Sequence, residues 1–258
     1  MIKGLYTSAL GMTTQMKRMD VVSNNIANAN TTGFKRDMVA TQSFSEELAK
    51  RLDDPRTPAG RDHDEPIGRM SMGVFVDTVY TDFTVGNLMA TDGAYDLAIL
   101  SDGFFVVESA DANGKPVLRY TRDGSFTRAV DGTLRTKDGF LVQGQGGAVT
   151  IPDGFMTVTA DGSIFVDGEY VDALRLTDFE DKESLRKIGS NLYATTEQSI
   201  ERLMTGAVQQ GVLENSNINP VREMVEMIAL SRAYETNQRM IGIHDTILGR
   251  AVSDIGRR

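Results

Sequence analysis

The sequence contains no cysteine and no tryptophan, and it has only two histidines. The absence of cysteine excludes disulfide bonds, thiolate nucleophiles and cysteine-ligated metals. Two histidines are too few for a conventional zinc centre, and the sequence carries no nucleophile-elbow or zinc-protease motif. We therefore predict a protein that is not an enzyme, with no catalytic residue, no cofactor and no metal site. A catalytic carboxylate pair of the glycosidase kind is brought together only by the fold, so spacing along the sequence does not reveal such a pair.

Long apolar runs are also missing. No run approaches the roughly 20 residues that cross a membrane, and no continuous apolar segment of a cleaved signal peptide stands near the start. The formal net charge of -9 argues against a nucleic-acid partner held by phosphate contacts. Lys17, Arg18, Lys35 and Arg36 make the opening segment locally basic, and we predict that they lie on a solvated helix face and loop. These features predict no membrane insertion, and either a cytoplasmic protein or one exported without signal cleavage.

The first 29 residues carry the main structural signal. Apolar side chains recur there in steps of three and four, which is the spacing of a heptad seam on one helix face. No proline interrupts the segment, and Gly4 and Gly11 fall off the predicted seam. Such a stripe needs a partner helix. The seam consists of Ile2, Leu5, Ala9, Met12, Met16, Met19 and Ile26, with Ser23 in the one gap.

Amide side chains are unusually frequent at the end of this segment. Asparagine competes with the helical backbone for hydrogen bonds, so its abundance indicates either lateral contacts with neighbouring subunits or a fraying helix end. Asn24, Asn25 and Asn28 are the predicted lateral contacts.

The partner helix is predicted at the other end of the chain. Asn219-Pro220 is a standard helix start, because asparagine caps the first turn and proline suits the first helical position. A second apolar edge near this start suits a helix that contacts the N-terminal helix on one side and a neighbouring subunit on the other. The alternative is an ordinary helical pair within one globular fold. The seam is Met227, Leu230, Tyr234, Ile241, Leu248 and Ile255, with Asn237, His244 and Ala251 between, and the second edge is Val221, Met224, Val225 and Ile228.

Between the helices, the pattern changes to period two from about residue 72. Asp-Gly pairs recur between short apolar runs, and such pairs favour tight hairpin turns. The intervals between them vary, unlike those of calcium-binding repeats. We predict an antiparallel β domain over residues 72–217. The pairs begin at Asp92, Asp102, Asp123, Asp131, Asp138, Asp153, Asp161 and Asp167.

Residues 34–71 are predicted to be a linker or arm. Within them, 38–52 suits a short helix or an extended arm, and the proline-rich, charged stretch 53–69 suits a mobile loop. The predicted fold class is α+β: residues 1–33 and 218–258 form a helical assembly domain of paired, coiled-coil-like helices around the β domain.

The sequence resembles the bacterial flagellar rod and hook family. The resemblance spans nearly the whole chain and is most specific at its two ends. The length and the closing motif are most similar to the distal rod protein, with the proximal rod protein as the alternative. The motifs are residues 8–12, 20–35, 217–228 and 232–238 at the ends, and 96–99, 102–107 and 120–126 in the β domain.

The resemblance implies a structural subunit whose terminal helices pack as tubes around a central channel. It implies self-assembly into a hollow helical rod that transmits torque, location in the basal body and cell envelope, and export by the flagellar apparatus without signal cleavage. The implied partners are other copies, other rod proteins, the hook protein and the export apparatus; contact with envelope bushing rings is left open. A β-rich surface binding module on a coiled-coil stalk is the alternative of a different class. The predicted interface and packing residues are Ile2, Leu5, Met12, Met16, Met19, Asn24, Asn25, Ile26, Asn28, Val221, Met224, Met227, Leu230, Tyr234, Asn237, Ile241 and Leu248.

Overall fold

A computed structural model describes residues 2–43, 47–51, 65–71, 73–111, 114–204 and 206–255. The chain divides into two compact units, which we treat separately. The helical unit comprises Met1–Asn24, Asp37–Tyr80 and Val221–Arg258, and the β unit comprises Asn25–Arg36 and Thr81–Pro220.

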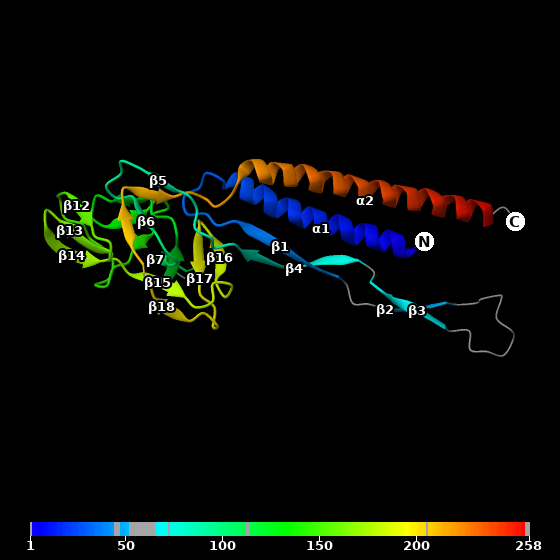
Figure 1. Ribbon diagram of the computed structural model, residues 1–258, viewed down its shortest axis with the longest axis horizontal. Helices are drawn as coiled ribbons and strands as arrows, with labels where there is room; N and C mark the ends of the chain where they lie inside the picture. Colours follow the sequence, from blue (N-terminus) through cyan, green and yellow to red (C-terminus); the bar gives the residue numbers. More distant parts are fainter. Residues whose placement is uncertain are drawn as a thin grey trace. The chain divides into compact units, whose positions relative to one another are not determined.

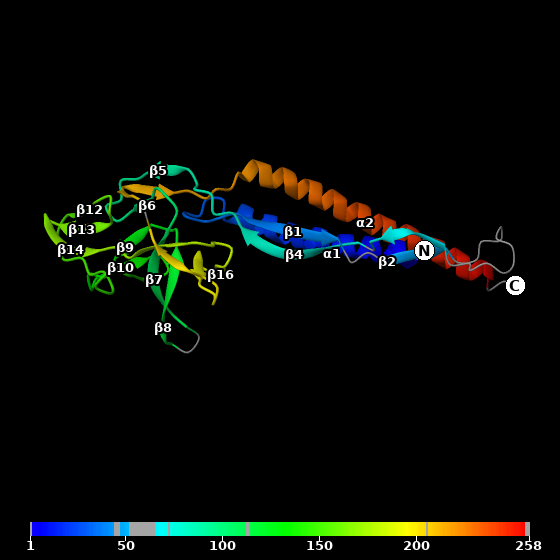
Figure 2. The same cartoon turned by 60° about the horizontal axis from the view of Figure 1, so that its bottom comes forward.

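The helical unit is built on the two predicted terminal helices, α1 (Ile2–Ala27) and α2 (Pro220–Ile255). They lie side by side and run in opposite directions (Figures 1 and 2). Proline occupies the first position of α2, as the sequence predicts. Neither helix is long and apolar enough to span a membrane.

Among the described residues, four strands complete the helical unit, so the predicted arm is extended rather than helical. β1 (Asp37–Ser43) pairs with β4 (Val74–Thr81), and β2 (Glu47–Arg51) pairs with β3 (Glu65–Met70). Of the predicted loop 53–69, residues 65–69 belong to β3 and the rest lies outside the described residues.

The β unit holds the remaining strands, and every pairing with a defined register is antiparallel. Its largest sheet has nine strands, seven of them in the order β16-β17-β8-β7-β11-β10-β9; β15 also pairs with β7, and β18 pairs with β15. β12, β13 and β14 form a second sheet, and β19–β6 and β20–β5 form two-stranded pairs. The bounds are β5 Leu88–Ala90, β6 Leu97–Ile99, β7 Phe104–Ala110, β8 Pro116–Thr121, β9 Phe126–Arg128, β10 Leu134–Thr136, β11 Leu141–Val142, β12 Met156–Val158, β13 Ser163–Val166, β14 Glu169–Ala173, β15 Leu176–Phe179, β16 Arg186–Gly189, β17 Leu192–Ala194, β18 Glu201–Leu203, β19 Val208–Gln210 and β20 Val212–Glu214.

β7 is the central strand of this unit, because it is buried on both faces. Successive strand residues point to opposite faces of a sheet. Phe105 and Val107 accordingly join a large aliphatic core. Phe104 and Val106 join a smaller, aromatic core on the other side, where Phe104 and Tyr193 rings meet edge to face at 5.6 Å.

Four of the eight Asp-Gly pairs form hairpin turns, as predicted. They connect β9 to β10, β10 to β11, β12 to β13 and β13 to β14. The other four join strands that do not pair with each other. Gly132 and Gly162 have φ values of 82° and 87°, which glycine adopts without strain.

These turns belong to two successive three-stranded meanders of the same design. In each, the glycine N–H donates to the carbonyl three residues earlier, at 3.0 Å for Gly132 and 2.9 Å for Gly162. The registers also correspond, so the meander β9–β10–β11 is repeated in β12–β13–β14. The corresponding pairs are Leu134–Arg128 with Ile164–Val158, and Thr136–Phe126 with Val166–Met156.

The compact units divide the chain differently from the predicted domain boundaries. Residues 25–36, placed by the sequence in the helical domain and linker, belong to the β unit, whereas β4 belongs to the helical unit. The α+β class, the two terminal helices and the central antiparallel strands agree with the prediction.

Candidate assembly site

A buried ion pair fixes the segment that follows α1 to the β unit. Lys35 Nζ donates a hydrogen bond of 2.5 Å to Glu214 Oε1 and one of 2.7 Å to the carbonyl of Thr84. The side chains of Lys35 and Glu214 are 0% and 1% exposed. Gly86 N–H donates to the same carboxylate oxygen at 2.8 Å. Three stretches distant in sequence therefore meet at one charged pair.

A second cation lies beside this pair. Arg122 Nε is 3.6 Å from Glu214 Oε2, and its guanidinium group also lies over the ring of Phe104 at 5.8 Å. Burial lowers the pKa of the Lys35 ammonium group, while the charge of Glu214 and its hydrogen bond oppose that shift. Removing one partner of a buried pair leaves an uncompensated charge, so the arrangement is sensitive to single substitutions.

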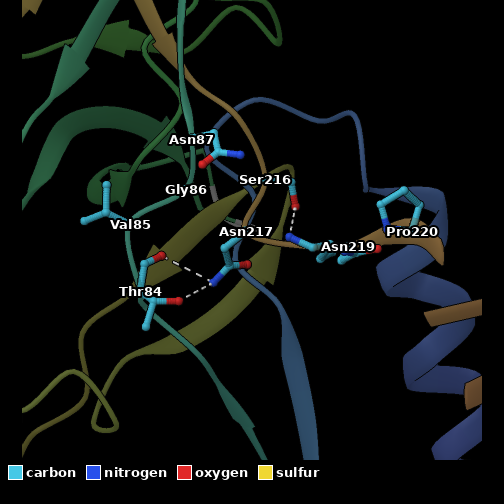
Figure 3. A pocket seen from close by; sticks show the side chains of 9 residues that line it. Thr84, Val85, Gly86, Asn87, Ser216, Asn217, Asn219 and Pro220 are labelled. Carbon is cyan, nitrogen blue, oxygen red and sulfur yellow. Dashed lines mark hydrogen bonds between the residues drawn. The ribbon is translucent and has the colours of Figure 1, made fainter. Parts of the chain in front are cut away.

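Asn217 joins the same three stretches through its amide group, and Figure 3 shows the part of this network that reaches Thr84. Its Oδ1 accepts from the N–H of Arg36 at 2.8 Å. Its Nδ2 donates to the carbonyl of Asp82 at 2.9 Å and to Thr84 Oγ1 at 3.0 Å. Asn217 also lines a polar cavity of about 460 Å³ that extends to Pro220.

Backbone contacts complete this cluster, which we call the anchor and define as residues 33–36, 82–87 and 214–217 of the β unit. Gly33 N–H donates to the carbonyl of Glu214 at 2.7 Å, and Asp82 N–H donates to that of Arg36 at 2.8 Å. Gly33 has φ 65°, and a Cβ there would lie 2.4 Å from the backbone of Arg122. The anchor thus fixes the chain just after α1, just after β4 and just before α2.

The anchor corrects the prediction that all four basic residues of the opening segment are solvated. Lys35 is fully buried, where its ammonium group bonds to Glu214 and to the Thr84 carbonyl, and Arg18 forms a 3.1 Å ion pair with Glu226 in the helical unit. Sequence reasoning missed Glu214 and Asn217 as well. The sequence feature that could have pointed to a buried ion pair is Glu214 itself, a charged residue that directly follows the apolar Val212 and Leu213.

The predicted seam of α2 is the covered face of that helix. Leu230 is buried at 4% exposed. The other described seam residues are half-buried, namely Met227, Tyr234, Asn237, Ile241, His244, Leu248 and Ala251.

On α1 the covered face is wider than predicted and its centre is shifted. Leu5, Ala9, Met12, Met19 and Ile26 are half-buried, but Met16 is 45% exposed and the Ile2 side chain lies outside the described residues. The most buried positions are Ser8, Thr14, Val22 and Asn25. Thr14 Oγ1 donates to the carbonyl of Val74 at 3.0 Å, so part of the shift arises because β4 covers a face of α1.

The prediction that Gly4 and Gly11 lie off the helix contact is wrong. A Cβ on Gly4 would lie 2.6 Å from His244 Nε2, and one on Gly11 would lie 3.0 Å from Asn237 Nδ2. Both glycines therefore face α2. Hydrophobic periodicity did not show this, because glycine contributes no apolar side chain to a seam.

The three predicted lateral asparagines lie in different environments. Asn24 is exposed and Asn28 is half-buried, with Oδ1 accepting from Thr31 Oγ1 at 3.2 Å. Asn25 is 1% exposed within the single chain. The Asn25 side chain is therefore covered by its own chain, without a second subunit.

α2 also presents large apolar side chains that nothing covers within the described chain. Val221, Met224, Val225 and Ile228, the predicted second edge, are all exposed. After a gap of twelve residues, exposed apolar side chains at spacings of three and four resume further along the helix. We call Val221, Val225, Ile228, Met240, Ile243 and Ile247 the outer stripe; their exposed fractions run from 42% to 64%.

Family models match three parts of the chain. Residues 5–35 match the flagella basal body rod protein model, and residues 98–166 match the D1 domain of the flagellar hook protein FlgE/F/G. Residues 209–254 match the C-terminal model of the flagellar basal body rod FlgEFG proteins. Lys35 and Glu214 lie in the first and last of these matches.

Relatives with similar sequences cover the chain almost completely. The flagellar basal-body rod protein FlgG of Buchnera aphidicola (subsp. Acyrthosiphon pisum) is 34% identical over 263 residues, which cover 96% of this chain and 98% of the relative. FlgF of Caulobacter vibrioides is 36% identical over 262 residues, covering 100% and 99%. The hook-basal body complex protein FlhO of Bacillus subtilis is 30% identical over 273 residues, with both chains fully covered. The chain therefore belongs to the flagellar basal-body rod protein family.

Proposed function

We propose that this chain is a subunit that polymerises through α1 and α2 into a hollow helical rod, which transmits torque and lines the export channel. The family supports the broader part of this proposal, because its members are structural, non-enzymatic proteins of the flagellar basal body. The outer stripe is the single observation that supports polymerisation through the helices.

The outer stripe supports assembly for an energetic reason. Exposed apolar surface of this extent on one helix marks an interaction surface. Burying each large aliphatic side chain contributes about 1.5–3 kcal/mol relative to leaving it in water. A second copy supplies an apolar partner for every such helix, and contacts that do not close into a ring generate a helical filament.

The anchor supports the transmission of torque. The chain passes between the two units four times, after residues 24, 36, 80 and 220. Hydrogen bonds and the ion pair Lys35–Glu214 hold the stretches next to three of these passages to one another. Force applied to the helices of one subunit therefore reaches its β unit at several connected points.

Within the rod, we propose a distal position and keep a proximal one as the alternative. The closing motif, residues 217–228 and 232–238, supports the distal position by its resemblance. Identity over the whole chain does not discriminate, because the rod proteins FlgG and FlgF match at 34% and 36%. The binding-module alternative is not favoured, since the similarity includes the helices as well as the β region.

The proposed partners are other copies of this chain, neighbouring rod and hook proteins, and the flagellar export apparatus, with export that cleaves no signal. Quantitative mass spectrometry of purified hook–basal bodies tests the proposal. A copy number well above those of the other rod proteins supports the distal position, and a low copy number supports the proximal one. Absence of the chain from the particles contradicts the rod assignment.

A further inference from the structure

The contacts between α1 and α2 repeat every seven residues at two glycines. Gly4 lies against His244 and Gly11 lies against Asn237, so a step of seven along α1 matches a step of seven back along α2. Arg18, seven residues beyond Gly11, forms an ion pair with Glu226, which lies about one turn beyond the α2 position that the series gives. Both glycines lack the Cβ atom that the opposing side chain would otherwise meet.

The opposing side chains are polar members of an otherwise apolar seam. Asn237 and His244 occupy seam positions among Leu230, Tyr234, Ile241 and Leu248, and both are half-buried. Polar residues at such positions reduce the stability of a helix pair but specify its register. An apolar seam alone accepts a slip of one heptad, about 10 Å along the helix, since apolar residues again meet apolar residues.

Only the observed register places a polar side chain of the seam against each of the two glycines. A slip of seven residues in one direction places Asn237 against Gly4 and leaves Gly11 without its asparagine. A slip in the other direction places His244 against Gly11 and moves Asn237 to Arg18, where α1 has a long side chain in place of a notch. Either slip also separates Arg18 from Glu226.

We propose that Gly4 and Gly11 are notches that set the register of the helix pair, with His244 and Asn237 as the side chains that fill them. In this structure α1 of the same chain occupies the notched face of α2. The outer stripe is then the face left for a second copy. Only this last step rests on the proposed function, because the register belongs to the single subunit.

The test places Ala at the notches of the full-length chain, with two matched controls on α2. Gly242 and Gly249 are helical glycines at which an added Cβ would meet no neighbouring described residue within 4 Å. Spin labels at Thr13→Cys and Gln238→Cys, both exposed positions in a chain without cysteine, report the distance between the helices.

We expect Gly11→Ala to broaden or shift the distance distribution and to lower Tm by about 5 °C, because the added methyl group overpacks the contact with Asn237. Gly242→Ala and Gly249→Ala should leave the distance unchanged and keep or raise Tm, since alanine favours helix. Asn237→Ala added to Gly11→Ala should restore both the distance and most of Tm, which separates a register effect from general misfolding.

The proposal is overturned if Gly11→Ala behaves like Gly242→Ala, or if Asn237→Ala does not rescue it. Both readouts use the purified subunit. Failure of the register proposal is therefore distinguishable from failure of the rod assignment, which the composition of hook–basal bodies decides.

Discussion

Lys35 and Glu214 are 179 residues apart in the sequence, yet their side chains share a 2.5 Å hydrogen bond in the interior of the β unit. Lys35 follows the first helix and Glu214 precedes the last one. The pair therefore joins the two ends of the β unit that lead into α1 and α2.

Lys35→Met should destabilise the β unit by about 3 kcal/mol, because Glu214 loses its main counter-charge in a buried position. Arg122 at 3.6 Å compensates in part, which keeps the expected loss near the low end of the range for broken buried pairs. Urea denaturation followed by circular dichroism measures the change.

The control for this prediction is Lys137→Met, which removes the same charge at an exposed turn. Replacing both partners, in Lys35→Met with Glu214→Leu, should recover part of the loss. An equal effect of Lys35→Met and Lys137→Met would show that the buried pair does not hold the anchor.

Gly33→Ala should cost considerably more stability than Gly139→Ala. Both glycines have positive φ, 65° and 89°, so both substitutions strain the backbone by roughly 1–2 kcal/mol. Only at Gly33 does the new Cβ meet backbone, 2.4 Å from the carbonyl carbon of Arg122; at Gly139 it meets no described residue within 4 Å. Comparing the Tm values of the two variants separates the steric clash at Gly33 from the positive-φ strain that both variants share. Equal Tm values would contradict close packing at the anchor.

Acid should destabilise the β unit below about pH 4. Hydrogen bonds from Thr133 lower the pKa of Asp131, those from Thr159 and Ser163 lower the pKa of Asp161, and the hydrogen bond from Lys182 lowers that of Asp102. A carboxyl group with a lower pKa when folded binds fewer protons in the folded state. Its contribution is therefore fully present above the unfolded pKa and is lost as the pH falls through the folded value.

The urea midpoint of the β unit, measured between pH 7 and pH 2.5, tests this. In the variant Asp131→Asn with Asp161→Asn, the fall of the midpoint with acid should be shallower, because two of the titrating groups are gone while the amide oxygens still accept hydrogen bonds. An unchanged pH dependence in that variant would contradict the assignment.

Local sequence patterns predicted the structure correctly where a feature depends on the residues of a single helix or turn. The heptad from Met227 to Ala251 identified the covered face of α2, and Asn219-Pro220 identified its start. Asp131-Gly132 and Asp161-Gly162 marked true hairpins, because the turn itself selects these residues.

Contacts between distant segments were not predictable in this way. Lys35 looks solvated in sequence because nothing nearby along the chain neutralises it, and Glu214 lies in a different segment. Gly11 looks irrelevant to packing because its role is the space that it leaves for Asn237. The shift of the covered face on α1 depends on β4, whose contact through Thr14 joins residues 60 positions apart.

The outer stripe gives the most direct test of assembly through the helices. Ile243→Asp places a charge on an exposed stripe residue, whereas Gln238→Asp places the same charge on another exposed face of the same helix. Both variants should fold, as circular dichroism of the purified chains can verify. Leu230→Asp is less informative, since Leu230 is already buried within the subunit.

The decisive measurement is the amount of each variant in hook–basal bodies purified from cells that lack the wild-type protein. The proposed rod subunit predicts that Gln238→Asp is incorporated at the wild-type level and supports swimming, and that Ile243→Asp is absent from the particles and leaves the cells non-motile. Wild-type incorporation of Ile243→Asp would contradict polymerisation through the outer stripe of α2.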